Sequence, residues 1–158
     1  MNELLLELSK TLVTRQLKLV TVESCTGGWI GKTVTDIAGS SSWFEAGFIT
    51  YTNESKNRLV NVPMSLFDEF GAVSIEVANA MASGANAIFP RAIAVSVTGC
   101  AGPGGGSETK PVGTVCIAVC LHGQVNSQRF LFKGNREQVR RSSVIEALKM
   151  VMDVLAVK

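Results

Sequence analysis

The chain has 158 residues, of which 46% are hydrophobic and 18% are charged, and its formal net charge is +2. These values predict a single domain, residues 1–158, that is large enough to bury a core. Acidic and basic residues are interspersed, so no basic stripe indicates a nucleic-acid partner, and the apolar stretches are too short to span a membrane. The N-terminus lacks the charged and apolar regions of a signal peptide, and we therefore expect a cytoplasmic protein.

Hydrophobic periodicity and turn residues predict helices that alternate with strands along most of the chain. Helices are predicted over residues 2–16, 26–38, 63–71, 74–89 and 135–155, with a further short one that Asn53 caps. Strands are predicted over residues 17–23, 46–52, 92–97, 112–120 and 124–132, the last two forming a hairpin that turns at His122-Gly123. This order predicts an α/β fold, a three-layer α/β/α sandwich with a mixed, mostly parallel sheet.

The segment from Glu23 to Gly28 joins the first predicted strand to the second predicted helix. Ser24 lies where the strand ends, and Gly27 and Gly28 let the backbone approach a ligand closely. A hydroxyl held there, near the first N–H groups of a helix, suits a nucleophile or an anion site, although an ordinary helix N-cap is the alternative. Cys25 stays a rival nucleophile, because a helix N-terminus favours a thiolate.

Two more predicted strands end in polar groups. Tyr51 closes the second strand, with Asn53 and Lys56 just beyond it, and Thr98-Gly99 follows the buried strand 92–97. In α/β sheets, ligands bind beyond the carboxyl ends of the strands, so we expect one cleft to gather these groups. The spacing alone supports an anion- or nucleotide-binding domain and leaves a hydrolase open.

Three other features of the sequence are weaker indications of function. The segment Gly27–Thr33 has the wrong spacing for a phosphate-binding P-loop, because the required first glycine falls on Thr26. The glycine-rich stretch 99–106 is either a flexible surface loop or a functional one. The four cysteines form no CxxC pair and the chain has one histidine, so we expect reduced, buried cysteines and no metal site.

Five segments together resemble the CinA C-terminal domain family, in the family's order and over nearly the whole chain: Glu23–Gly28, Gly47–Lys56, Thr98–Gly106, Lys110–Val115 and Gly134–Arg140. The stand-alone members of that family are nicotinamide-nucleotide amidohydrolases of the PncC type. Cys100 departs from the pattern, because an aliphatic residue is expected there.

The resemblance implies hydrolysis of nicotinamide mononucleotide to nicotinic acid mononucleotide and ammonia. Since the chain has no cluster of metal ligands, we expect no metal and no cofactor. It makes Ser24 the nucleophile and Lys56 its base, with Tyr51 and Thr98 beside them. The substrate-binding residues that we expect are Thr26, Gly27, Gly28, Asn53, Gly99, Gly102, Gly105, Arg136 and Arg140. We also expect a homo-oligomer, a dimer. A catalytically silent module that binds a pyridine nucleotide is the alternative.

Hydrolysis of an amide by a serine requires a neutral base and hydrogen-bond donors to the oxyanion. A lysine base must be neutral when it acts, so its pKa must fall through burial or through a nearby cation, a role that we expect Arg140 to share. Backbone N–H groups near Gly99 or Thr26 are the predicted donors to the oxyanion. Arg136 and Arg140 share one face at the start of the last helix, where cations are unfavourable, and this placement predicts an anionic partner.

Overall fold

The computed structural model describes residues 1–157 and is built around one five-stranded sheet in the order β2-β1-β3-β4-β5. The strands are β1 (Lys18–Glu23), β2 (Phe44–Ile49), β3 (Ala92–Gly99), β4 (Thr114–Leu121) and β5 (Gln124–Leu131). β1 pairs in parallel with β2 and β3, whereas β4 pairs antiparallel with β3 and β5. Four strands therefore run in one direction and β4 runs against them, which is the mixed, mostly parallel sheet that the sequence predicts.

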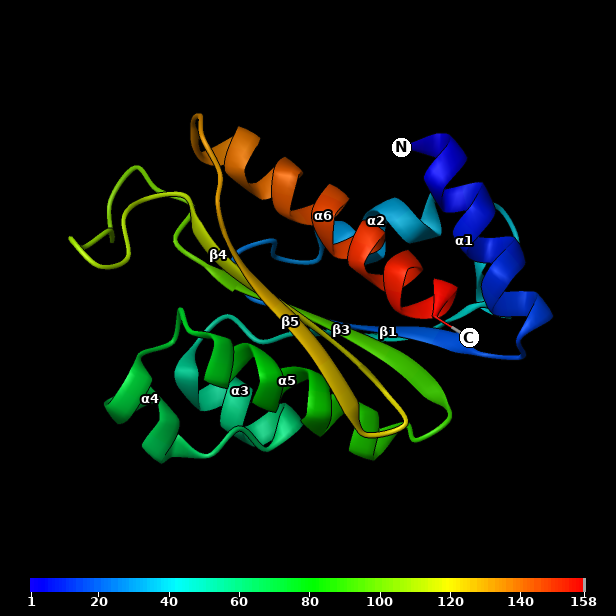
Figure 1. Ribbon diagram of the computed structural model, residues 1–158, viewed down its shortest axis with the longest axis horizontal. Helices are drawn as coiled ribbons and strands as arrows, with labels where there is room; N and C mark the ends of the chain where they lie inside the picture. The colour runs from blue at the N-terminus through cyan, green and yellow to red at the C-terminus, as the bar shows by residue number, and fades with distance from the viewer. Residues whose placement is uncertain (158) are drawn as a thin grey trace.

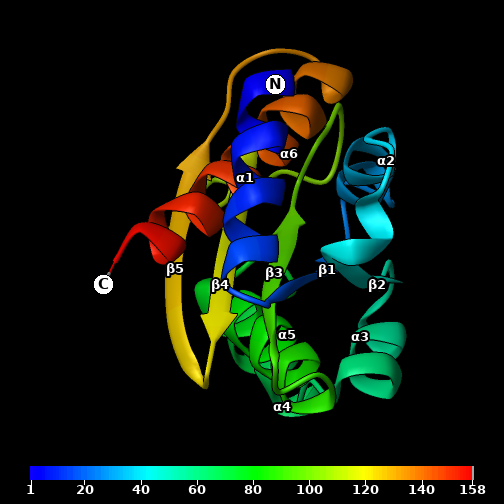
Figure 2. The ribbon, with the colours of Figure 1, turned by 90° about the vertical axis from the view of Figure 1, so that its right-hand side faces the viewer.

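Helices cover both faces of this sheet (Figures 1 and 2). One face carries α1 (Asn2–Thr14), α2 (Trp29–Thr35) and α6 (Arg136–Ala156), and the other carries α3 (Asn53–Val60), α4 (Met64–Phe70) and α5 (Ile75–Ile88). A short 3-10 helix, Ser40–Ser42, precedes β2. The predicted three-layer sandwich is confirmed. None of the helices among residues 1–157 combines the length and the apolar composition that a membrane span requires.

Each face of the sheet has its own apolar core, because successive side chains of a strand point to opposite faces. Leu19, Ile93 and Val95 pack against α1 and α6 in the larger cluster, whereas Val20 and Val22 pack against α5 in the smaller one. The strands β3 and β4 are buried over seven of their eight residues, as expected for strands covered on both faces.

The cap of α3 differs from the prediction. Asn53 is the first helical residue, and Thr52 is the N-cap, because its extended backbone lets the hydroxyl accept a hydrogen bond from the Ser55 N–H. The Ser55 hydroxyl accepts from the Thr52 N–H in return, so the two residues form a capping box. Lys56 follows the Thr52 cap by four residues, about one helical turn, and lies on the buried face of α3.

Other boundaries move by a few residues. The second helix begins at Trp29 rather than Thr26, and β2 covers Phe44–Ile49 rather than residues 46–52. The predicted N-caps Ser74 and Asn135 are confirmed, since their side chains accept from the Val77 and Gln138 N–H groups.

Candidate active site

The turn after β1 holds Ser24 in place with backbone hydrogen bonds. The Ser24 N–H donates to the Val97 carbonyl of the neighbouring strand, and the Ser24 carbonyl accepts from the Gly27 N–H. The chain then enters α2 through Gly28, whose φ of 97° favours glycine, and a Cβ there would lie 3.1 Å from the Ile49 Cδ1 atom. The serine hydroxyl is therefore fixed by the sheet and not by a flexible loop.

Ser24 and Lys56 lie together, as the family resemblance implies. The Lys56 Nζ atom is 3.0 Å from the Ser24 Oγ atom, and both side chains are buried, with 8% of Ser24 and 1% of Lys56 exposed. Lys56 takes part in no ion pair within residues 1–157. A hydroxyl in contact with an uncompensated amine is the arrangement that a nucleophile with an adjacent base requires.

Burial lowers the pKa of Lys56 to about 8, and a small opposing contribution comes from Cys25. An amine with such a pKa is partly neutral near physiological pH and can accept the serine proton. Our prediction that Arg140 helps to lower this pKa is wrong, because removal from water is the dominant cause and Arg140 does not contribute.

Cys25 is a poor rival for the role of nucleophile. Its side chain is buried, and burial raises the pKa of the thiol to about 12 despite the nearby Arg140 and Lys56. The thiol therefore stays protonated at neutral pH. All four cysteines are free and buried, as the sequence predicts.

Tyr51 and Arg136 meet at the outer edge of the site. Tyr51 is 58% exposed, and its hydroxyl accepts a hydrogen bond of 3.2 Å from an Arg136 guanidinium nitrogen. The same guanidinium donates to the Gly102 carbonyl at 2.7 Å. These contacts join the end of β2, the start of α6 and the glycine-rich loop, three segments far apart in the chain.

Arg140 lies one helical turn further along α6 and holds the turn after Ser24. Its guanidinium donates to the carbonyls of Cys25 and Thr26, each at 3.0 Å, and lies 5.3 Å from the centroid of the Trp29 ring. A cavity of 430 Å³ opens here, lined by Thr26, Gly27, Gly28, Trp29, Lys32 and Arg140. Neither Arg136 nor Arg140 has a carboxylate partner within residues 1–157, so no described side chain neutralises either guanidinium charge.

The remaining predicted site residues make ordinary hydrogen bonds or packing contacts, or are exposed. The Thr98 hydroxyl donates to the Ala72 carbonyl at 2.8 Å. Gly99 packs against β4 so closely that a Cβ would lie 2.7 Å from a Val115 methyl group, which is a structural reason for glycine. A Cβ on Gly105 would lie 3.5 Å from the Cys100 sulfur. Asn53 is exposed at the start of α3.

Glu23 is a site residue that sequence reasoning missed. Its carboxylate is only 1% exposed, and its Oε1 atom accepts from the Gly31 N–H of α2 at 3.0 Å. Burial raises the pKa of Glu23, and backbone N–H groups of α2 and the Thr26 hydroxyl oppose that shift. The carboxylate anchors α2 to the end of β1. The available signal was a charged residue, Glu23, placed directly after the mostly apolar run Leu19–Val22.

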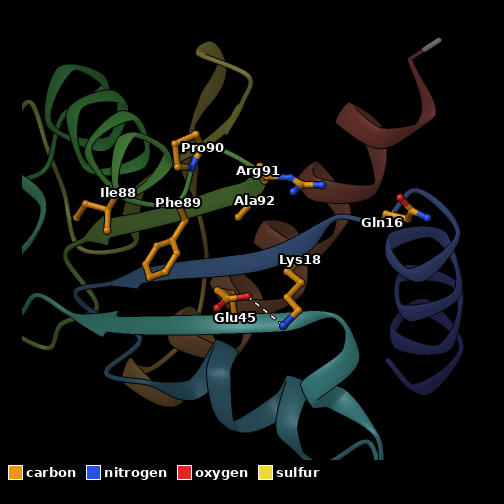
Figure 3. Close-up of a pocket in the computed structure, with 8 residues that line it drawn as sticks. All are labelled: Gln16, Lys18, Glu45, Ile88, Phe89, Pro90, Arg91 and Ala92. Carbon is orange, nitrogen blue, oxygen red and sulfur yellow. Dashed lines mark ion pairs between the residues drawn. The ribbon is translucent and has the colours of Figure 1, made fainter.

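A second cavity of 430 Å³ lies at the opposite ends of β1 and β3 (Figure 3). It is bounded by Lys18 and Ala92, where β1 and β3 begin, and by an exposed ion pair of 3.1 Å between Lys18 and Glu45. Ser24 follows the other end of β1, so this cavity is separate from the Ser24–Lys56 pair. Among residues 1–157, no three His, Cys, Asp or Glu side chains are grouped as metal ligands would be.

Comparisons with known proteins place these features in a family. The model of the CinA C-terminal domain matches residues 1–155. The chain is 52% identical over 131 residues to the nicotinamide-nucleotide amidohydrolase PncC of Pseudomonas putida, covering 83% of this chain and 82% of that protein. It is 46% identical over 144 residues to the PncC protein of Escherichia coli K12, covering 90% and 87%.

A solved structure agrees with these sequence relationships. The competence damage-inducible protein A of Klebsiella pneumoniae superposes with a TM-score of 0.94 at 34% sequence identity, over 98% of this chain and 96% of that one. The residues that the family model matches, 1–155, include every element from α1 to β5 and the greater part of α6. The chain belongs to the CinA C-terminal domain family.

Proposed function

We propose that this protein is an amidohydrolase that converts nicotinamide mononucleotide to nicotinic acid mononucleotide and ammonia. The observation that carries the proposal is the buried contact of 3.0 Å between the Lys56 Nζ and the Ser24 Oγ atoms, with the pKa of Lys56 lowered to about 8. The identity of 46–52% to proteins named nicotinamide-nucleotide amidohydrolase supports the choice of substrate.

In the first step, neutral Lys56 takes the proton of Ser24 while the Ser24 Oγ atom bonds to the carboxamide carbon. The electron pair of the C=O double bond moves to the oxygen, which becomes an oxyanion. The Thr26 N–H donates to no backbone acceptor within residues 1–157, so it is available to stabilise this charge. The Lys56 ammonium then gives its proton to the departing nitrogen as the C–N bond breaks, releasing ammonia.

In the second step, water attacks the acyl-enzyme ester. Lys56, neutral again, takes a proton from the water as the new C–O bond forms, and the same proton returns to Ser24 when the ester bond breaks. The product is a carboxylic acid, whose remaining proton passes to the released ammonia or to solvent to leave the carboxylate, and Ser24 and Lys56 return to their initial protonation states. The two arginines whose charges have no carboxylate partner, Arg136 and Arg140, lie within reach of the turn and bind the anionic nucleotide phosphate.

The test is to incubate the purified protein with nicotinamide mononucleotide and to measure ammonia and nicotinic acid mononucleotide as they form. Equal amounts of both products are expected. Binding of the nucleotide by calorimetry without any ammonia would overturn the proposal and favour the silent nucleotide-binding module. Free nicotinamide, which carries the carboxamide without the phosphate, is the control substrate and should be hydrolysed poorly.

Replacing Arg140 with alanine is expected to raise KM for the nucleotide about tenfold or more, since a charge-assisted contact is lost. The pH at which kcat/KM reaches half its plateau should not move, because burial and not Arg140 sets the pKa of Lys56. The measurement is a pair of pH–rate profiles, and Arg141→Ala on the same helix is the matched control. A profile displaced to higher pH would show that Arg140 does act on Lys56.

A further inference from the structure

Three hydroxyl side chains lie side by side at the carboxyl ends of neighbouring strands. Val22 of β1 pairs with Phe48 of β2 and with Ser96 of β3. Two residues further along the chain come Thr50 and Ser24, each just past the end of its strand, and Thr98, which is still within β3. Because side chains two apart point to the same face of a sheet, all three hydroxyls face the layer of α3, α4 and α5.

Contacts on both sides of Ser24 agree with this placement. Val22 and Phe48 belong to the core cluster on the α5 side of the sheet. The Ser96 and Thr98 hydroxyls donate to the Ala78 and Ala72 carbonyls, at the start of α5 and just before it. The Thr50 N–H donates to the Glu23 carbonyl at 2.8 Å, so the pairing of β1 and β2 continues one residue past the last paired position.

Thr50 differs from the other two hydroxyls because it has no partner. It is fully buried, and its Oγ1 atom has no hydrogen-bond partner among residues 1–157. Ser24 is bonded to Lys56 and Thr98 to Ala72. Buried hydroxyls without a partner are rare in folded proteins and need an explanation.

Lys56, in turn, has fewer hydrogen-bond acceptors around it than its donors need. As an ammonium it has three N–H donors, but its Nζ atom contacts one acceptor within residues 1–157, the Ser24 Oγ atom. Neighbouring strands are separated by about 4.8 Å, so Thr50 lies one strand spacing from the serine that Lys56 already contacts. A buried ammonium with too few acceptors and a buried hydroxyl without a partner therefore lie beside the same residue.

We propose that the Thr50 hydroxyl accepts a hydrogen bond from Lys56 once Lys56 has taken the proton of Ser24, and that Thr50 is thereby a positioning residue for the base. The inference rests on the proposed function. The proton moves from the Ser24 oxygen to the Lys56 nitrogen as before, and no bond to Thr50 forms or breaks. Thr50 orients the ammonium and stabilises its charge until the proton passes to the leaving nitrogen.

Few other charges act on this contact. The titratable neighbour that acts on Lys56 is the Cys25 thiol, which is neutral below its pKa of about 12. The charged side chains of the surrounding helices are all exposed, and they are Glu54 and Arg58 of α3, Asp68 and Glu69 of α4, and Glu76 of α5. Removing the Thr50 hydroxyl should therefore report on the Lys56 ammonium with little interference.

The experiment compares Thr50→Val, which removes the hydroxyl and keeps the shape, with Thr50→Ser, which keeps the hydroxyl. Ser143→Ala is the matched control, because Ser143 is a fully buried hydroxyl on α6 that bonds to the Val139 carbonyl. Thr50→Ala serves as a second variant in case valine does not fold. Two quantities are measured: the pKa of the Lys56 amine in the free protein by NMR titration, and kcat and KM for nicotinamide mononucleotide.

In Thr50→Val, the pKa of Lys56 should fall, because the charged form loses an acceptor, and kcat should fall roughly 10- to 100-fold with KM changed much less. Thr50→Ser should restore both quantities, and Ser143→Ala should resemble the wild type. An unchanged pKa of Lys56 in Thr50→Val overturns the inference, and so does a change confined to KM. If the wild-type protein releases no ammonia, the proposed function fails, whereas the NMR titration still decides whether Thr50 contacts Lys56.

Discussion

Replacing Ser24 with alanine is expected to lower kcat by roughly 10⁴-fold or more, because the hydroxyl that attacks the carboxamide in the proposed mechanism is lost. The fold should survive, since Ser24 is held by main-chain hydrogen bonds and its side chain bonds only to Lys56 within residues 1–157. Affinity for the nucleotide should change little, because the arginines of α6 are untouched. The measurements are ammonia release and calorimetric binding of nicotinamide mononucleotide.

Cys25→Ala is the matched control for this experiment, since Cys25 is the next residue and its thiol is protonated at neutral pH. It should keep most of the wild-type turnover. If Cys25→Ala loses turnover while Ser24→Ala keeps it, the thiol is the nucleophile and the assignment of Ser24 is wrong.

Replacing Lys56 with methionine should have a similarly large effect on turnover, because Ser24 then has no base. The wild-type kcat/KM should rise with pH and level off above the lowered pKa of Lys56, about 8. Lys56→Met should lose this dependence together with most of the activity. A wild-type profile that is flat between pH 6 and about 9 would contradict a lysine base.

The same substitution should stabilise the folded protein. The pKa of Lys56 is about 8 in the folded state and 10.5 ordinarily, so between these values the unfolded chain binds more protons than the folded one. Stability therefore rises with pH across this window, and the full penalty for burying Lys56 is present below pH 8. At pH 7, Lys56→Met should raise the free energy of unfolding by at most about 3 kcal/mol.

Urea titrations at pH 7 and near pH 10 measure this difference. The stability advantage of Lys56→Met should shrink at the higher pH, where the wild-type lysine is neutral in the folded state. An advantage that is equal at both values would mean that improved packing, and not the buried charge, is its cause.

The sequence by itself determined the order of the helices and strands and the three-layer arrangement. Apolar residues repeat with the period of a helix or a strand, and these periods follow from local backbone geometry. The N-caps Ser74 and Asn135 were predictable for the same reason, because a cap bonds only to the next few residues. The cap of α3 was misplaced by one residue, since Thr52 and Asn53 are both good caps and only the backbone conformation selects between them.

The sequence also predicted that Ser24 and Lys56 are the reacting pair, through the family resemblance and not through spacing. That they are in contact was decided by the tertiary structure. Thirty-two residues separate them, and the contact exists because β1 and β2 pair in parallel and α3 then packs beneath them. Local periodicity contains no information on which strands pair.

Only the tertiary structure decided what lowers the pKa of Lys56 and which groups surround this side chain. The pKa of Lys56 is lowered by removal from water, which depends on every atom that covers it, and not by Arg140, which bonds to the Cys25 and Thr26 carbonyls. The position of Thr50 beside Ser24 likewise follows from strand register. Burial and register are properties of segments distant in the chain, and this is the physical reason why the sequence alone did not reveal them.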